Sequence, residues 1–151
     1  MVTRRGLLVA GAGLAVTGCG APDDELPPDA ELLAPSLAAA LALVETYELV
    51  GGRAGRALAA RERDHAERLR AAGAGGGAAA PEAPGGSPLA TALALEQAAM
   101  RAHVHAVGLV RGANRRLAAE LLADDARHLN AVQALLGRDP LPTAFPDGRD
   151  A

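Results

Sequence analysis

Two acid–histidine pairs in the sequence share one spacing. Glu62 stands three residues before His65, and Asp125 stands three residues before His128. Side chains three residues apart on an α-helix project from the same face, so each acid can reach the same point as its histidine. Both pairs interrupt otherwise apolar runs spaced by four and three residues: Leu58, Glu62, His65, Leu69 and Ala72, and Leu121, Asp125, His128, Val132 and Leu135. The sequence therefore predicts two helices that turn titratable groups toward a core.

A buried acid is unfavourable unless it is hydrogen-bonded, paired with a charge or bound to a metal ion. Carboxylate oxygens combined with imidazole nitrogens suit iron or manganese, and they can also hold zinc. The chain has one cysteine, Cys19, which excludes a cysteine-rich metal site and an internal disulfide. The two pairs therefore indicate a carboxylate–histidine metal site.

Four helices are expected to position these groups, over residues 36–50, 53–72, 89–110 and 114–136. Ser36 is a plausible N-cap after Pro35, and glycines follow or separate the four segments. Residues 73–88 are rich in Gly, Ala and Pro and predict a long flexible crossover. Short turns within each helix pair and a long link between the pairs predict an all-α four-helix bundle of two antiparallel hairpins.

The first and third helices offer further acids to this core. On the third helix, Glu96 and His103 occupy seam positions, with His103 as a less favoured extra ligand. On the first helix, Glu45 and Glu48 belong to two alternative seams. At 1.5 Å of rise per residue, Glu45 lies about 10 Å from the turn and Glu48 about 5 Å. Glu62 lies about 16 Å from the same turn, so Glu45 is the better candidate.

Composition narrows the class of protein. Half the residues are apolar, but Tyr47 and Phe145 are the only aromatic ones, which suits closely packed Ala- and Leu-rich helices. The net charge is −3 and all basic residues are arginine, without a basic patch interleaved with aromatic side chains. A nucleic-acid-binding role is therefore not expected.

The N-terminus is typical of an exported bacterial lipoprotein. Residues 3–8 resemble the twin-arginine export motif, and residues 16–19 resemble a lipobox that ends at Cys19. The apolar run between them is shorter than the roughly 20 residues that span a bilayer. We expect an export signal over residues 1–18, a tether over 19–34 that begins at lipidated Cys19, the helical domain over 35–137 and a tail over 138–151. This predicts an extracytoplasmic protein anchored to the membrane through its lipid.

Over about residues 32–137 the chain resembles the ferritin-like superfamily, in particular small exported ferritin-like lipoproteins. The resemblance implies a di-iron or di-manganese centre that reacts with dioxygen or peroxide. It implies oxygen ligands from Glu45, Glu62, Glu96 and Asp125 and one nitrogen ligand to each metal from His65 and His128. The chain departs from the family pattern at Asp125, where a glutamate is usual, and in the first helix, which has no tyrosine one heptad after Glu45.

A second reading of the same residues needs no metal. Buried histidines can hydrogen-bond to the carboxylates, and an arginine such as Arg63 or Arg101 can reach Glu62. The result would be a polar network that fixes helix register in a metal-free envelope lipoprotein. Coordinates distinguish the two readings, because the metal site requires the six groups to converge within a few ångströms.

Overall fold

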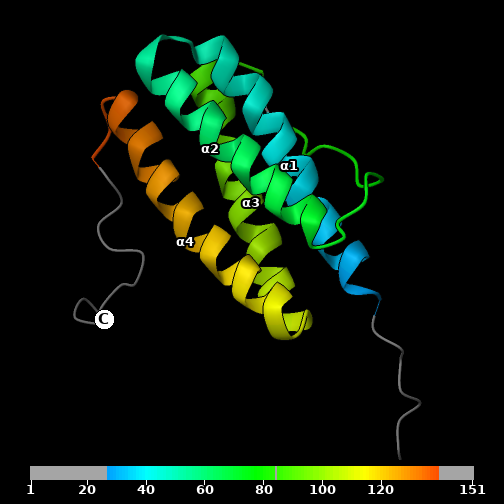
Figure 1. Cartoon of the computed structure of the whole chain (residues 1–151). Helices are drawn as coiled ribbons and strands as arrows, with labels where there is room; N and C mark the ends of the chain where they lie inside the picture. Colours follow the sequence, from blue (N-terminus) through cyan, green and yellow to red (C-terminus); the bar gives the residue numbers. More distant parts are fainter. Residues whose placement is uncertain (1–26, 84, 140–151) are drawn as a thin grey trace, which may run out of the picture.

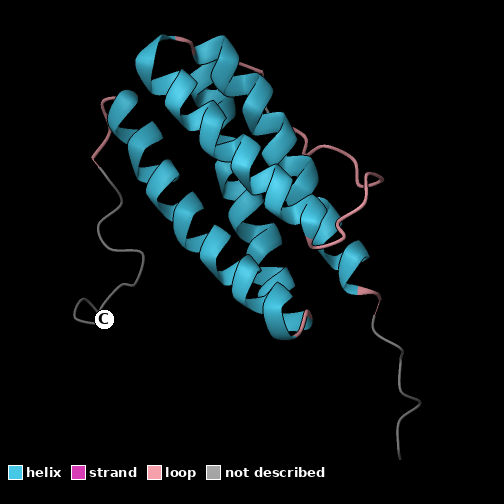
Figure 2. Ribbon diagram, viewed as in Figure 1, coloured by secondary structure: helices cyan, strands magenta, loops and turns pink. Residues whose placement is uncertain are grey.

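The computed structural model describes residues 27–83 and 85–139, and these residues form four α-helices and no strand (Figures 1 and 2). The helices are α1 (Asp29–Val50), α2 (Gly52–Ala71), α3 (Pro88–Leu109) and α4 (Gly112–Leu135). The prediction of an all-α protein with four helices is confirmed. The export signal, Cys19 and nearly all of the C-terminal tail lie outside the described residues.

Two contacts between distant segments fix the directions of the helices. At the start of α1, Asp29 accepts a hydrogen bond from the Asn114 side chain at the start of α4, with an N···O distance of 2.7 Å. Near the end of α1, the Tyr47 hydroxyl donates to Glu96 in the first half of α3. Consequently α1 and α4 run in one direction and α2 and α3 in the other (Figure 1). α1 packs along α2 and α3, and α3 packs along α4, whereas α2 and α4 contact each other less extensively.

The core consists of two apolar clusters, one toward each end of the bundle. The first cluster holds Leu33 and Leu37 of α1, and the second holds Leu43 and Tyr47 of the same helix. Between the two clusters, α2, α3 and α4 bury polar side chains instead: Glu62, His65, Glu96, His103, Asp125 and His128. We call these six residues the polar layer. Apolar packing on both sides shields the polar layer from water.

The segment between α2 and α3 connects opposite ends of the bundle. Ala74, just after α2, belongs to the first cluster, and Ala83 packs against the second. Ser87 then caps α3, because its side-chain oxygen accepts from the Ala90 N–H at 3.3 Å, and Pro88 occupies the first helical position. This segment lets α3 run in the same direction as α2.

α1 begins at Asp29, seven residues before the predicted start at Ser36. Pro35 lies inside the helix and removes one backbone hydrogen bond, which is why the sequence predicted a boundary there. The helix continues because the preceding turn buries Leu32 and Leu33 in the first core cluster. Ser36 is therefore an interior helical residue with a buried side chain, and its predicted role as an N-cap is wrong.

The face that α1 buries also differs from both predicted seams. Leu33, Leu37, Leu43 and Tyr47 face the core, whereas Leu41 is 37% exposed. α1 is long and apolar enough to cross a membrane, but the same is true of many core helices, and α1 packs in both core clusters here. The burial of Tyr47 instead of a glutamate is the main consequence for the polar layer.

Gly55 allows α1 and α2 to pack closely beside the second cluster. A β-carbon at Gly55 would lie 2.6 Å from the Tyr47 carbonyl oxygen, a distance that real β-carbons essentially never show. The turn that precedes it uses Gly51 with a positive φ of 67°, and the Gly51 N–H donates to the same Tyr47 carbonyl. These two glycines place Tyr47 firmly at the α1–α2 contact.

Candidate metal centre

Three helices supply the polar layer, and each supplies two of its side chains. α2 carries Glu62 and His65 three residues apart, and α4 carries Asp125 and His128 three residues apart. On α3, Glu96 and His103 are separated by one heptad, so both project toward the core at different heights. None of the six residues is more than 4% exposed. The structure thus buries every predicted ligand on α2, α3 and α4, including the less favoured His103.

The Glu62 carboxylate lies at the centre of the polar layer. Its Oε1 atom is 2.7 Å from His128 Nδ1, and its Oε2 atom is 3.3 Å from His65 Nδ1. The two imidazole rings stack at 16° with their centroids 5.5 Å apart. Glu62 therefore presents one oxygen to a histidine of α4 and the other to a histidine of its own helix.

Asp125 joins the layer from the α4 side. Its Oδ1 atom is 3.5 Å from His65 Nδ1, and its Oδ2 atom is 3.2 Å from His103 Nε2. One ligand atom from each of Glu62, His65, Asp125 and His128 can be chosen so that all four lie within 4.8 Å of one another. The acid–histidine pairs of α2 and α4 therefore converge on one region, which accounts for four of the six groups that the metal reading requires to converge.

Glu96 reaches the other side of the layer and is held there by Tyr47. The Tyr47 hydroxyl donates a hydrogen bond to Glu96 Oε1, and the same oxygen is 3.7 Å from His128 Nδ1. Tyr47 is a member of the site that the sequence pattern did not predict. One signal could have found it: a lone tyrosine in an apolar helix needs an acceptor for its hydroxyl once it is buried.

Several buried atoms of the layer have no hydrogen-bond partner among the described residues. They are both carboxylate oxygens of Asp125, Oε2 of Glu96 and the Nδ1 atoms of His65 and His103. Buried polar atoms are almost always hydrogen-bonded in native proteins, and each exception calls for an explanation such as an ion. Oxygens and imidazole nitrogens left bare in one water-shielded layer form the donor set that a divalent transition metal binds.

The spacing of these atoms also fits a metal. Ligand atoms about 2.0–2.2 Å from one ion are about 2.8–3.6 Å apart at the 90° angle of octahedral and the 109.5° angle of tetrahedral coordination. The contacts of His65 with Glu62 and Asp125, and of His103 with Asp125, measure 3.3, 3.5 and 3.2 Å. They are longer than the usual charge-assisted hydrogen bond of about 2.7–2.9 Å. The donor atoms are therefore spaced so that they could hold a metal ion.

The pKa values of the two glutamates in the layer are shifted in opposite directions. Burial acts to raise the pKa of Glu62, but hydrogen bonds and attraction from His128 and His65 outweigh it, so this pKa lies below its ordinary value. Burial and the neighbouring charges of Glu62 and Asp125 hold the pKa of Glu96 well above its ordinary value, although the Tyr47 hydrogen bond opposes them. The layer therefore favours the anionic form of Glu62 and the protonated form of Glu96.

His65 and Tyr47 follow the same logic. Burial would lower the pKa of His65, but contacts with Glu62 and the charges of Asp125 and Asp124 raise it. Burial, the Glu96 charge and the hydrogen bond to Glu96 raise the pKa of the Tyr47 phenol far above its ordinary value. Tyr47 therefore stays a neutral donor to Glu96.

Asp124 supports the layer from its edge. Its Oδ2 atom is 3.5 Å from His65 Nε2, the ring nitrogen that faces away from Glu62. Although slight burial acts to raise the pKa of Asp124, a salt bridge with Arg127 lowers it, so the carboxylate stays charged. A carboxylate behind a histidine is the common arrangement that orients an imidazole toward a metal.

Two predicted ligands do not reach the layer. Glu45 and Glu48 are both exposed on α1, and Glu48 forms a salt bridge with Arg63 of α2. Their inward placement was wrong because α1 is rotated so that Leu43 and Tyr47 face the core. α1 therefore contributes no acid to the polar layer.

The arginines of the metal-free reading do not enter the layer either. Arg63 is half exposed and pairs with Glu48, and Arg101 is exposed on α3. What remains of that reading is the hydrogen bond between His128 and Glu62 and the one from Tyr47 to Glu96. Some polar groups of the layer are thus hydrogen-bonded to each other, and others have no hydrogen-bond partner among the described residues.

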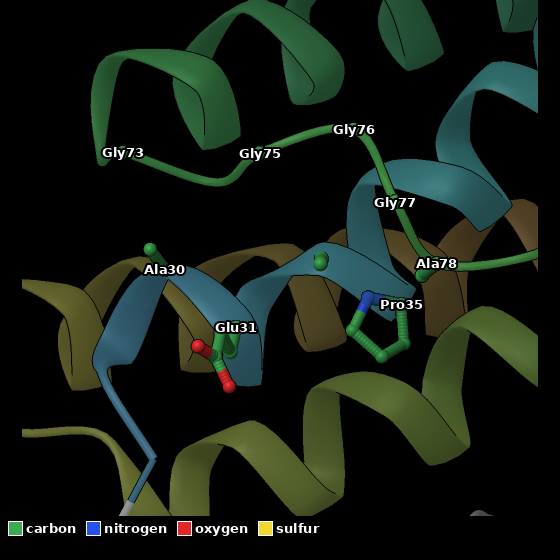
Figure 3. Close-up of a pocket in the computed structure, with 9 residues that line it drawn as sticks. Ala30, Glu31, Pro35, Gly73, Gly75, Gly76, Gly77 and Ala78 are labelled. Atoms are coloured by element: carbon green, nitrogen blue, oxygen red, sulfur yellow. The ribbon is translucent and has the colours of Figure 1, made fainter.

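Two cavities among the described residues lie away from the polar layer. One of about 360 Å³ lies between the start of α1 and the glycine-rich chain after α2, where Gly73 to Gly77 passes over Ala30, Glu31 and Pro35 (Figure 3). Another, of about 520 Å³, lies over the outer surface of α3 and is lined by Met100, Val104 and His105. Neither is lined by any of the six polar-layer residues.

Comparison with known proteins gives no relative from which a role could be inferred. No protein-family model, no curated protein and no solved structure matches the chain. The candidate site is therefore interpreted from its own residues.

Proposed function

We propose that this chain is an exported, lipid-anchored protein whose ferritin-like four-helix bundle binds a pair of iron or manganese ions in the polar layer. One observation carries the proposal: Glu62 and His65 of α2 and Asp125 and His128 of α4 bring ligand atoms within 4.8 Å of one another in a buried layer, where neither Asp125 oxygen has a hydrogen-bond partner among the described residues. The long connection between α2 and α3 and the ligand pairs on α2 and α4 support the ferritin-like assignment. The twin-arginine motif and the lipobox at Cys19 support the location.

Glu62, His65, Asp125 and His128 would supply the central ligands, and Glu96 would complete the set from α3. Because the two Glu62 oxygens face different histidines, this carboxylate would offer one oxygen to each side of the layer. When bound, such a pair of ions exchanges electrons with small oxidants such as dioxygen or peroxide. The apolar clusters exclude bulk water, Asp124 orients His65, and Tyr47 fixes the position of Glu96.

The alternative is a metal-free scaffold in which the polar layer fixes helix register. The 2.7 Å hydrogen bond between His128 and Glu62 favours it, because it satisfies two buried groups without any ion. Against it stand both oxygens of Asp125, which have no hydrogen-bond partner among the described residues. A register-fixing network would be expected to satisfy this acid first.

Elemental analysis of the purified full chain tests the proposal. We expect iron or manganese at up to two ions per chain in the wild type and a strong loss in the His65→Ala/His128→Ala double variant. The His105→Ala variant is the matched control, because His105 is exposed on α3. Equal metal content in wild type and double variant, or none in either, would refute the metal centre and leave the scaffold reading.

A further inference from the structure

The donors of the polar layer are divided unequally between the two sides of Glu62. Beside Oε1 stand one imidazole, that of His128, and the Glu96 carboxylate, whose Oε1 is 3.7 Å from His128 Nδ1. Beside Oε2 stands His65, whose Nδ1 is also 3.5 Å from Asp125 Oδ1. The first side is therefore one imidazole and two carboxylates, with Glu62 shared between the sides.

His103 adds a second imidazole to the Asp125 side. Its Nε2 is 3.2 Å from Asp125 Oδ2, the ring is 2% exposed, and its Nδ1 has no hydrogen-bond partner among the described residues. His103 lies seven residues after Glu96 on α3, so one helix faces one side of the layer with a carboxylate and the other with an imidazole. The side beside Asp125 thus combines two imidazoles with two carboxylates.

Ligand type decides which ion each side prefers. Imidazole nitrogen favours zinc, cobalt, nickel, copper and iron, whereas carboxylate oxygen suits manganese and magnesium. Affinity at nitrogen-containing sites rises from Mn²⁺ to Co²⁺, so a second imidazole widens the gap between these two ions. The two sides also differ in their hydrogen bonds. Tyr47 hydrogen-bonds to Glu96 and Glu62 hydrogen-bonds to His128, whereas neither oxygen of Asp125 has a hydrogen-bond partner among the described residues.

We propose that the polar layer contains two unequal metal positions, and that His103 makes the one beside Asp125 tighter and more selective for nitrogen-preferring divalent ions. The position beside Glu96 is weaker and discriminates less against Mn²⁺. This proposal rests on the proposed function, because it assumes that the polar layer binds metal. It makes His103 a ligand where the ferritin-like pattern supplies one histidine to each ion.

Titration of the metal-free full chain with Co²⁺ and, separately, with Mn²⁺ tests the inequality. Calorimetry gives the affinities, and the visible absorption of Co²⁺ reports the entry of nitrogen ligands. In the wild type we expect two resolved Co²⁺ steps, the first with the stronger absorption change. We expect Mn²⁺ to show a smaller difference between its two steps.

Two single variants assign the steps. His103→Gln should weaken the first Co²⁺ step by at least about tenfold, the loss typical even for removing a supporting partner of a metal ligand, and should leave the second step in place. Glu96→Gln should weaken the second step and preserve the first. His105→Gln is the control for the loss of a histidine from α3, since this residue is exposed. Circular dichroism verifies that each variant is helical.

The outcomes separate this proposal from the one on which it rests. Two equal Co²⁺ steps in the wild type, or a His103→Gln variant that binds like the wild type at both steps, would overturn the unequal positions and leave the metal centre standing. Absence of Co²⁺ and Mn²⁺ binding in the wild type would overturn both. Even if His103→Gln fails to fold, the wild-type titration decides whether the two metal positions are unequal.

Discussion

Replacing Asp125 with asparagine should change the stability of the protein in opposite directions with and without metal. Asp125 is fully buried, and neither of its oxygens has a hydrogen-bond partner among the described residues. Its nearest polar contacts are His103 at 3.2 Å and His65 at 3.5 Å. Attraction to these imidazoles compensates a buried carboxylate incompletely where hydrogen bonds do not complete the pairing. In the metal-free protein, the buried Asp125 carboxylate therefore lowers the stability of the folded state.

The size of the effect follows from that burial. An unsatisfied buried polar group destabilises a protein by about 1–3 kcal/mol, and more when it is charged. Asparagine has nearly the same shape and is still polar, but it removes the buried negative charge, and for this reason Asp125→Asn should stabilise the metal-free protein by about 1–3 kcal/mol. In a domain of about 100 residues, each kcal/mol raises the melting temperature by roughly 4 °C, so the expected rise is about 4–12 °C.

Metal should reverse the order of the two proteins. A ligand at 100 times its dissociation constant stabilises the folded state by about 2.7 kcal/mol, or roughly 11 °C here. The wild type should gain this increment on addition of Mn²⁺ or Co²⁺, whereas Asp125→Asn should gain little. Differential scanning calorimetry of both proteins, with a chelator and with metal, measures the crossing.

Asp64→Asn provides the matched control. The same substitution is made at Asp64 on α2, whose side chain is 65% exposed. It should change the stability of the protein by no more than about 0.5 kcal/mol, both with a chelator and with metal. A metal-free Asp125→Asn protein that melts below the wild type would show that the carboxylate is compensated and structural. Equal gains from metal in both proteins would remove Asp125 from the ligand set.

Three further predictions test the surroundings of the site. Tyr47→Phe should destabilise the protein by about 1.5–3 kcal/mol in urea unfolding, because it removes a buried hydrogen bond to the Glu96 carboxyl group; no change would mean that this bond is absent. Metal-free Glu96→Gln should gain stability over the wild type as the pH rises from about 4.5. Because the pKa of Glu96 is raised in the folded protein, the folded wild type holds a proton that the unfolded chain releases in this pH range. The stability of the wild type therefore falls as the pH rises. Gly55→Ala should destabilise the protein by about 1–3 kcal/mol because the added β-carbon would clash with the Tyr47 carbonyl. At Gly108 an added β-carbon would have no neighbouring atom within 4 Å, so Gly108→Ala should stabilise α3 by up to about 1 kcal/mol. Equal effects of the two substitutions would refute the close α1–α2 contact.

The rotation of α2 and α4 could be predicted because each has one apolar face. The large side chains at the remaining positions of α2 are arginines and acids, so only one rotation buries Leu58 and Leu69, and that rotation also buries Glu62 and His65. In α4, Leu121 and Val132 fix the rotation in the same way and bury Asp125 and His128 between them. Pattern alone therefore identified the two acid–histidine pairs.

The rotation of α1 could not be predicted in this way. Residues 37–44 are all alanine, leucine or valine, so several rotations bury similar apolar area and the acids on the following turn follow whichever is chosen. Tertiary contacts decide the rotation: Tyr47 finds an acceptor in Glu96, and Gly55 admits the α1 backbone. The early start of α1 was missed for a related reason, because burial of Leu33 outweighs the local effect of Pro35.

The loss of an acid from α1 changes what the polar layer is best suited to do. With a tyrosine in the core face of α1, the hydrogen-bonded half of the layer lies around Glu96 and His128, and the bare half lies around Asp125, His65 and His103. A register-fixing network explains most of the first half, where Tyr47 and Glu62 hydrogen-bond across helices and only Oε2 of Glu96 has no partner among the described residues. It does not explain the second half, where Asp125 lies 3.5 Å from His65 and 3.2 Å from His103 and neither of its oxygens has a hydrogen-bond partner among the described residues. The two readings therefore describe different parts of one layer, and the case for a metal is strongest where Asp125 meets His65 and His103.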